Sequence, residues 1–208
     1  MMAGLTSQQR MVKRVFDVVM AAVGLLLTWW IMILAILAAT IDTRRPGLFV
    51  QRRVGRGGRS FPILKVRTMR QVEGRPSSVT TARDERVTRL GRFLRRTKVD
   101  ELPQLLNVLV GHMSFVGPRP DVPGFADELL GDDRVILTIR PGITGPATLE
   151  FRDEEELLAG QEDPEGFNRE VLFPAKVRLN RAYVENYGLS KDIGYLLRTV
   201  FGRRRAAR

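Results

Sequence analysis

Two adjacent carboxylates, Asp100 and Glu101, lie in the stretch KVDELPQ (98–104). Three cations come just before them: Arg95, Arg96 and Lys98. An ionised Asp among cations can ligate a divalent metal or attack an electrophilic phosphorus atom. A simpler interpretation is that Asp100 caps a helix that begins there, with Pro103 tolerated in its first turn. In either case, we expect the helix terminus and the cations to favour the ionised carboxylate.

Four cations, Arg95 among them, could bind the substrate of such a carboxylate. Lys65 projects from a predicted strand, and the other three lie beside loops or prolines that fix their backbone: Arg95, Arg119 and Arg140. If these side chains converge, they can bind a diphosphate, because guanidinium groups match phosphate oxygens in a bidentate manner. A Mg²⁺ ion at Asp100 and Glu101 would then complete the charge neutralisation that phosphoryl transfer needs. If they do not converge, they are ordinary surface charges.

The whole chain has 208 residues, enough for one ordinary domain. Its net charge of +11 indicates an anionic partner, which could be nucleic acid, phospholipid or a phosphorylated substrate. Cys is absent and there is one His, which excludes disulfides, thiolate chemistry and the usual zinc sites.

A run of 24 uncharged residues, 18–41, is long enough to cross a bilayer and is apolar on all sides. Cations flank it on both sides: Arg10, Lys13, Arg14, Arg44 and Arg45. Both flanks therefore favour the cytoplasmic side, which a helix that bends and leaves by the same face satisfies, although a straight crossing stays open. We expect a membrane segment over 1–45 and a cytoplasmic-face catalytic domain over 46–208.

The remaining pattern predicts an α+β domain. Residues 48–54 and 61–68 read as a β-hairpin with its turn at 55–58, and 71–85 as a polar loop. Helices are expected over 86–96 and from about residue 100. Two proline-containing segments, 117–120 and 140–145, read as rigid connections, and the acidic segment 153–165 as a solvated face or loop.

The C-terminal segment has apolar residues at helical spacing, followed by Arg203, Arg204 and Arg205. This pattern is typical of a basic amphipathic helix on an anionic membrane surface. A core-packing helix with a basic tail explains it equally well.

Several long motifs occur together in a fixed order. They are KRVFDVV, PGLFVQRRVGRGGRSFPILKVRTM, LGRFLRRTKVDELPQLLNVLVGHMSFVGPRP, RPGITG and YVENYGLSKDIGYL. Through these motifs, from about residue 13 to residue 198, the chain resembles the bacterial sugar transferases. These are monotopic phosphoglycosyl transferases, which begin glycan assembly on polyprenyl phosphate.

The resemblance implies an enzyme of the bacterial inner membrane, with its active site on the cytoplasmic face, that takes a UDP-sugar. Asp100 matches the family nucleophile, which attacks the sugar-bearing phosphorus and expels UMP. Polyprenyl (undecaprenyl) phosphate then receives the sugar 1-phosphate from Asp100, by ping-pong kinetics. Glu101 matches the second acidic residue, with Mg²⁺ at the pair.

Lys65, Arg95 and Arg119 match the family's phosphate-site cations, and Arg140 joins them as a candidate from the residues alone. The family fold implies a re-entrant membrane helix-hairpin, a short β-hairpin and amphipathic helices on the membrane surface. Phospholipids are expected partners and nucleic acid is not, and the residues leave a homodimer open.

One departure from the family pattern concerns the membrane helix. The family commonly breaks this helix with a Ser-Pro pair, and Trp29-Trp30 stands in that place here. A bend would then depend on Gly24 and on the hydroxyl of Thr28 instead of on a proline.

Two alternative functions remain at this stage. One is a membrane phosphohydrolase that uses Asp100 and releases phosphate to water. The other is a non-enzymatic, membrane-tethered protein that binds nucleic acid or acts as a scaffold through its positive charge. The base-reading motifs of nucleic-acid-binding proteins are absent from the sequence, which disfavours the second.

Overall fold

The structure, a computed structural model, describes residues 4–70, 80–81 and 84–202. Most of the predicted loop 71–85 and the basic tail Arg203–Arg205 lie outside the described residues. The helices are α1 (Ser7–Thr43), α2 (Arg89–Thr97), α3 (Gln104–Val110), α4 (Pro146–Glu150), α5 (Glu154–Ala159), α6 (Pro164–Phe167), α7 (Phe173–Glu185) and α8 (Leu189–Phe201). The strands are β1 (Leu48–Val54), β2 (Ser60–Val66), β3 (Ser114–Val116) and β4 (Gly142–Thr144). The predicted α+β class is confirmed.

The long helix α1 begins at a capping box in which Thr6 and Gln9 exchange side-chain and backbone hydrogen bonds. Its inner side carries small residues: Ala21, Ala35 and Ala39 are buried. Gly24 belongs to the same inner side, since a Cβ there would lie 3.2 Å from a methyl group of Leu105 on α3. These small residues let the rest of the fold pack closely against α1.

The outer side of α1 carries large apolar residues that the protein leaves exposed: Leu26, Leu27, Trp29, Trp30, Leu34, Leu37 and Ile41. Within the described residues, α1 is the one helix long and apolar enough to cross a membrane. Only 11% of its most apolar window is buried, whereas the core helix of a soluble protein is mostly buried.

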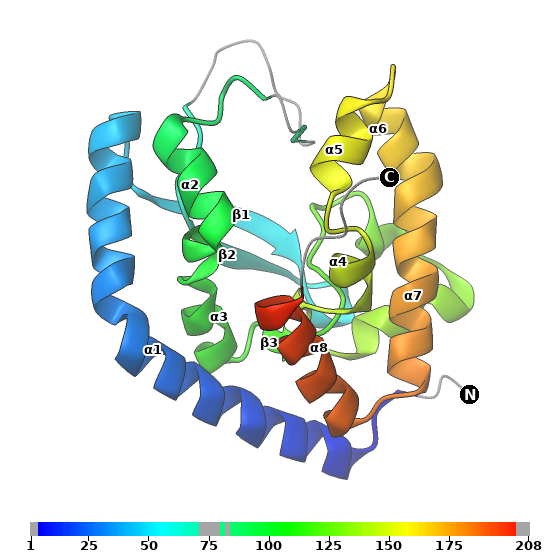
Figure 1. Cartoon of the computed structure of the whole chain (residues 1–208). Coiled ribbons are helices and arrows are strands. Elements are labelled where there is room, and N and C mark those ends of the chain that lie inside the picture. Colours follow the sequence, from blue (N-terminus) through cyan, green and yellow to red (C-terminus); the bar gives the residue numbers. More distant parts are fainter. Residues whose placement is uncertain (1–3, 71–79, 82–83, 203–208) are drawn as a thin grey trace.

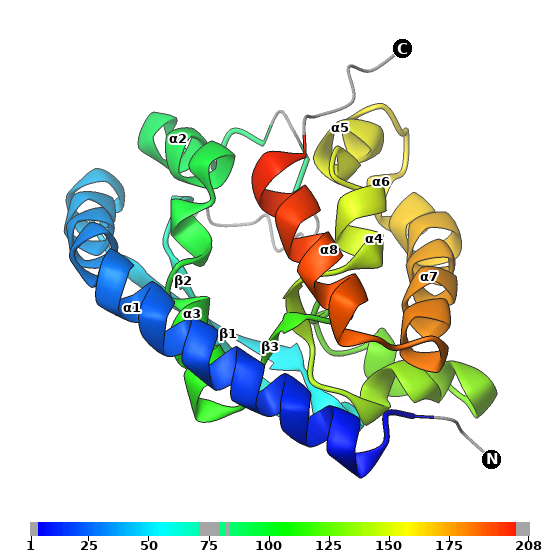
Figure 2. The same ribbon diagram turned by 60° about the horizontal axis from the view of Figure 1, so that its bottom comes forward.

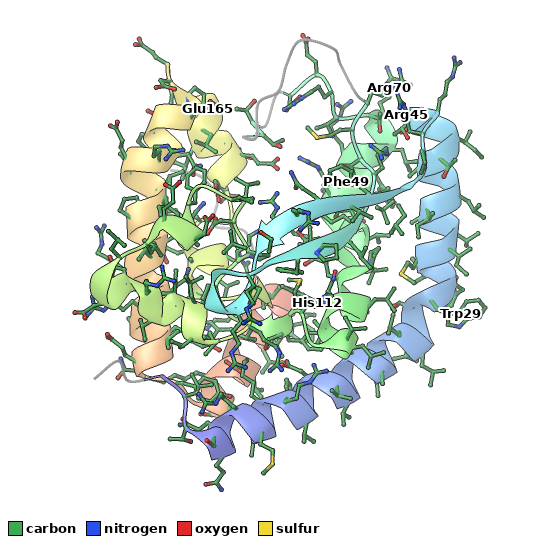
Figure 3. The ribbon with its side chains drawn as sticks, turned by 180° about the vertical axis from the view of Figure 1, so that it is seen from behind. Trp29, Arg45, Phe49, Arg70, His112 and Glu165 are labelled. Carbon is green, nitrogen blue, oxygen red and sulfur yellow. The ribbon has the colours of Figure 1, made fainter. Side chains whose placement is uncertain are left out.

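Helix α1 changes direction partway along its length, so that it lies along the bottom of the fold and then rises beside α2 (Figures 1 and 2). The bend lies next to Trp29, whose side chain points outward (Figure 3). Just before it, the Thr28 hydroxyl donates a hydrogen bond to the Gly24 carbonyl at 2.7 Å. Such a bond to the residue four positions back often bends a helix. The helix is continuous, and its re-entry into a bilayer stays a prediction.

The predicted hairpin is confirmed: β1 and β2 pair antiparallel, with Leu48 opposite Val66 and Val54 opposite Ser60. Its turn places Gly57 and Gly58 at positive φ, a conformation that glycine adopts without strain. A second, parallel pair joins β3 to β4. The segment 140–145, predicted to be only a connection, therefore contains a strand. Three residues of strand are too short to give an alternating pattern.

Two groups of contacts connect the elements around the acidic residues. Buried apolar residues from α1, β2, α3 and the connection after α3 form one cluster: Ala21, Phe61, Ile63, Val108 and Met113. The side-chain amide of Asn107 on α3 accepts from the Leu64 amide at 2.9 Å and donates to the Pro62 carbonyl at 2.8 Å. Asn107 therefore fixes α3 against the strand that carries Lys65.

A buried ion pair connects α1 to α8. Lys13 Nζ lies 2.5 Å from Asp192 Oδ2, and Tyr183 on α7 donates to Asp192 Oδ1 at 2.6 Å. Asp192 is fully buried, so its charge depends on these two partners. The amphipathic helix predicted at the C-terminus is present as α8, with its end exposed at Val200 and Phe201.

Candidate active site

The two adjacent carboxylates lie on a single 3-10 turn, Val99–Glu101, between α2 and α3. Lys98 ends α2 in the left-handed conformation (φ 61°, ψ 14°), which is uncommon for a residue with a side chain. Because α2 ends there, Asp100 lies in a tight turn, and α3 starts only at Gln104, after Pro103. The interpretation of Asp100 as a helix N-cap is therefore wrong: the turn has no side-chain capping hydrogen bond.

Asp100 is buried, at 7% exposure, and its Oδ1 has no hydrogen-bond partner among the described residues. Burial, with help from the charge of Glu101, raises the pKa of Asp100 to about 6. Lys65, Lys98 and Arg95 oppose this rise without cancelling it. The cations thus favour the ionised form, as expected, but burial outweighs them and the net shift of the Asp100 pKa is upward. At neutral pH, Asp100 is still mostly an anion, and no group among the described residues hydrogen-bonds its Oδ1.

Glu101 has a different environment from its neighbour. Its Oε1 accepts a hydrogen bond from Arg119 Nη2 at 2.7 Å and lies 4.0 Å from Lys65 Nζ. Burial alone would raise the pKa of Glu101, but the charges of Arg119 and Lys65 hold it at about 2. Glu101 is therefore a permanent anion that holds two cations beside Asp100.

The same contacts change the cations. Burial and the nearby charge of Arg119 lower the pKa of Lys65 to about 8, although Glu101 opposes this. The pKa of Arg119 is raised, first by the charge of Glu101. Lys65 comes from β2 and Arg119 from the loop after β3, so the predicted convergence of these two cations on the acidic residues is observed.

Arg95, on α2, lies at the edge of this group. Its Nε donates to the Thr68 hydroxyl at 3.1 Å, and its Nη1 pairs with Glu155 Oε1 at 2.9 Å. Helix α2 can approach this closely because Gly91 faces the Thr68 carbonyl: a Cβ on Gly91 would lie 2.1 Å from that oxygen. Arg95 lowers the pKa of Asp100, so its charge acts on the site.

The structure places Arg140 with a different set of residues. Its Nε donates to the Gly111 carbonyl at 2.8 Å, and Arg14 donates to the Val108 and Leu109 carbonyls at 2.6 and 2.8 Å. Both arginines therefore satisfy carbonyls at the C-terminus of α3, where cations are favourable. Among the described residues, Arg140 makes no hydrogen bond or ion pair with Asp100 or Glu101.

Sequence reasoning missed three residues beside Arg119. Arg53 on β1 donates to the Pro120 carbonyl at 3.3 Å, and the Val54 amide donates to the Asp121 carbonyl at 2.9 Å, which fixes the Arg119 loop. Burial raises the pKa of Asp121 to about 6, against the charges of Lys176 and Arg53. Asp121 could have been noticed in the sequence as the acid that directly follows the GPRP motif. No sequence motif marks Lys176 as a residue of the site.

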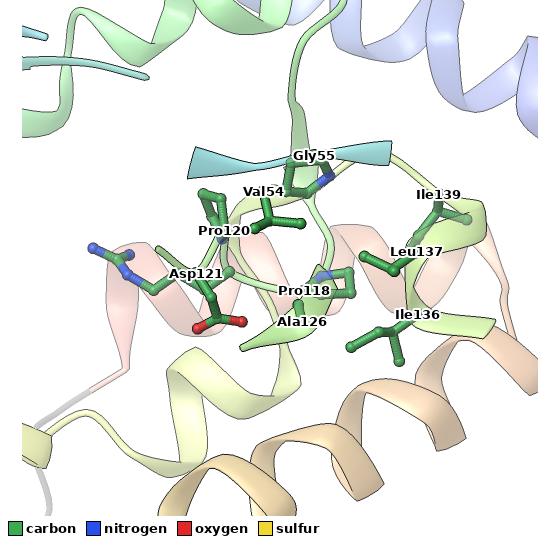
Figure 4. Close-up of a pocket in the computed structure, with 11 residues that line it drawn as sticks. Val54, Gly55, Pro118, Pro120, Asp121, Ala126, Ile136, Leu137 and Ile139 are labelled. Atoms are coloured by element: carbon green, nitrogen blue, oxygen red, sulfur yellow. The ribbon is translucent and has the colours of Figure 1, made fainter. Parts of the chain in front are cut away.

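A small pocket lies behind this loop (Figure 4). Its lining is mostly apolar, with Val54, Pro118 and Ile136 among the contributors, and its charged residues are Arg119 and Asp121. The apolar side packs the loop onto the protein. Arg119 can therefore direct its guanidinium group to Glu101.

The acidic segment 153–165, expected to be solvated, forms α5 and α6. Two of its carboxylates join the site: Glu155 pairs with Arg95, and Glu154 Oε1 lies 2.6 Å from Lys176 Nζ on α7. The described residues contain no group of three or more His, Cys, Asp or Glu side chains that could hold a metal ion together. Asp100 and Glu101 are two adjacent carboxylates that could hold a cation beside a phosphate.

The model of the bacterial sugar transferase family matches residues 8–204. The UDP-glucose:undecaprenyl-phosphate glucose-1-phosphate transferase of Caulobacter vibrioides is 40% identical over 192 residues, which cover 90% of this chain and 68% of that protein. The transferase of the same name from Escherichia coli is 34% identical over 95% of this chain, which spans 41% of the longer protein. The exopolysaccharide production protein PSS of Rhizobium leguminosarum is 35% identical, over 90% of this chain and 92% of that protein. The chain belongs to the bacterial sugar transferase family.

Proposed function

We propose that the protein transfers a sugar 1-phosphate from a UDP-sugar to polyprenyl phosphate, releasing UMP, through a covalent intermediate on Asp100. The observation that carries the proposal is the buried Asp100 carboxylate, whose Oδ1 has no hydrogen-bond partner in the described part of the chain, beside Glu101, Lys65 and Arg119. Relatives named as transferases of glucose 1-phosphate or galactose phosphate to undecaprenyl phosphate support the substrate classes.

In the first half-reaction, a carboxylate oxygen of Asp100 forms a bond to the sugar-bearing phosphorus. The bond between that phosphorus and the bridging oxygen breaks, and UMP leaves with the bonding electrons. In the second, a phosphate oxygen of the polyprenyl phosphate attacks the same phosphorus, and the bond to Asp100 breaks. The carboxylate is regenerated, and the lipid carries a diphosphosugar.

The chain's own residues supply positioning and charge. Lys65 and Arg119 are held by Glu101 at 4.0 and 2.7 Å, so they are pre-oriented for negative charge on the transferred phosphate. Because the pKa of Glu101 is about 2, Glu101 is a poor proton acceptor and acts through these two cations. Arg95 reaches the diphosphate from α2.

Mg²⁺ is the cofactor that these residues fit. It commonly binds through one or two carboxylates together with substrate phosphate oxygens. Asp100 Oδ1 is a buried acceptor to which no described residue donates a hydrogen bond. Asp100 and Glu101 would hold the ion. When bound, it neutralises charge on the diphosphate.

We further propose that α1 enters and leaves the cytoplasmic face of the inner membrane, with α8 on its surface. The exposed apolar side of α1 and its bend beside Thr28 support this arrangement. The exposed Ile193, Leu197 and Phe201 on α8 favour contact with lipid over packing in a core. Such a placement brings a soluble nucleotide sugar and a lipid phosphate to one site.

The test is an incubation with UDP-sugars labelled in the sugar-bearing phosphate, with Mg²⁺, with and without polyprenyl phosphate. We expect UMP release and labelled protein without the lipid, and labelled lipid with it. Asp100→Asn should abolish all three, because an amide is neutral and a poor nucleophile. Release of labelled phosphate to water would favour a phosphohydrolase instead. The absence of label from both protein and lipid with every UDP-sugar would contradict the proposal.

A further inference from the structure

The short acidic helix α5 carries two consecutive carboxylates that bind cations on opposite sides of the site. Glu155 reaches Arg95 on α2 at 2.9 Å, and Glu154 reaches Lys176 on α7 at 2.6 Å. Helices α2 and α5 lie across from each other at the same end of the fold (Figures 1 and 2). Helix α5 is therefore connected by one ion pair to each side.

Both guanidinium groups assigned to substrate phosphates already interact with α5. Arg95 pairs directly with Glu155. The pKa of Arg119 is raised mainly by the charge of Glu101, and Glu154 raises it further. A diphosphate brings negative charge to the same two cations. Substrate and α5 must therefore compete for them.

We propose that Glu155 is an internal competitor of the substrate diphosphate: it holds Arg95 in the free enzyme, and the nucleotide diphosphate replaces it. This inference rests on the proposed function. Arg95 keeps its direction during the exchange, because its Nε remains bonded to the Thr68 hydroxyl and only Nη1 is released.

The exchange is easy because the Glu155 side chain is 52% exposed and returns to water when it leaves. Exposed ion pairs contribute little free energy, so the pair orders Arg95 without blocking the substrate. An interaction that exists only in the free enzyme opposes binding and does not act in the transition state. Glu155 should therefore raise KM and leave kcat unchanged.

The kinetic test compares Glu155→Gln with Glu156→Gln. Glu156 is exposed on the same helix and makes no ion pair among the described residues, so its substitution removes the same charge without freeing Arg95. We expect KM for the UDP-sugar to fall by about two- to fivefold in the first variant, the range that an exposed ion pair allows, with kcat unchanged. The second variant should match the wild type. An unchanged or higher KM in Glu155→Gln, or an equal fall in both variants, would overturn the inference.

A second test needs no turnover. Backbone hydrogen exchange over residues 153–160 is measured in the wild-type protein with and without UDP and Mg²⁺. We expect faster exchange of α5 with UDP, because release of Glu155 removes one of the two described ion pairs that hold this helix. Slower or unchanged exchange would contradict displacement. Failure of the proposed function appears separately, as the absence of UMP release by the wild type.

Discussion

The two perturbed pKa values at the site predict how the first half-reaction depends on pH. Asp100 must be ionised to attack phosphorus, and Lys65 must be protonated to stabilise the phosphate charge. With pKa values of about 6 for Asp100 and about 8 for Lys65, kcat/KM for the UDP-sugar should be bell-shaped, with its maximum near neutral pH.

The magnitude follows from the Asp100 value. With a pKa of about 6, the ionised fraction is ~0.1 at about pH 5 and ~0.9 at about pH 7, so kcat/KM should rise about ninefold between them. An Asp at its ordinary value of 3.8 would be more than ~90% ionised at both, and the rate would hardly change. The assay measures the rate of the single burst of UMP without lipid acceptor, at UDP-sugar concentrations well below KM, so that its second-order rate constant gives kcat/KM for this half-reaction. The acceptor is left out because a polyprenyl phosphate itself titrates in this range.

Two variants assign the limbs of the profile. Lys65→Arg should remove the basic limb and leave the acidic one, since an arginine stays protonated throughout. Glu101→Gln should move the acidic limb to lower pH, because Asp100 loses the repulsion of a neighbouring anion. A profile that is flat between about pH 5 and about pH 7 in the wild type would refute the argument that burial controls Asp100.

Three further predictions follow from the same structure. Raising the Mg²⁺ concentration should move the acidic limb of the pH profile to lower pH, because metal and proton compete for the carboxylates. Chelation of the metal should stop UMP release. An acidic limb whose position does not change with Mg²⁺ concentration would place the metal elsewhere. Lys13→Met should lower the free energy of unfolding, measured by thermal melts, by about 3–5 kcal/mol, because it leaves the buried Asp192 carboxylate without its cation. Adding Asp192→Asn should recover part of this loss. Gly91→Ala should lower the unfolding free energy by about 1–3 kcal/mol and reduce kcat/KM, because the new Cβ would overlap the Thr68 carbonyl and displace α2. The control is Gly194→Ala on α8, where a Cβ meets open space, and it should change neither quantity.

Much of the molecule follows from local sequence. The apolar run predicted a long membrane-type helix, and Leu48–Val66 predicted a hairpin with its turn at the glycines, because these signals are periodic or depend on single turn residues. The site pair Asp100 and Glu101 was recognisable for a similar reason: its motif is contiguous. Such information lies within a few neighbouring residues and does not need the tertiary fold.

Tertiary structure alone decided how the site is charged and which cations belong to it. Asp100 has a raised pKa because the fold buries it, and the charge of Lys65, which comes from β2 far away in the chain, acts on it. Arg140 looked equivalent to Arg119 in sequence, yet it contacts the end of α3 while Arg119 contacts Glu101. Glu155 looked like a solvated residue and instead pairs with Arg95, 60 positions earlier in the chain. Long-range contacts and desolvation have no local pattern, so residue types could suggest these charges but could not pair them.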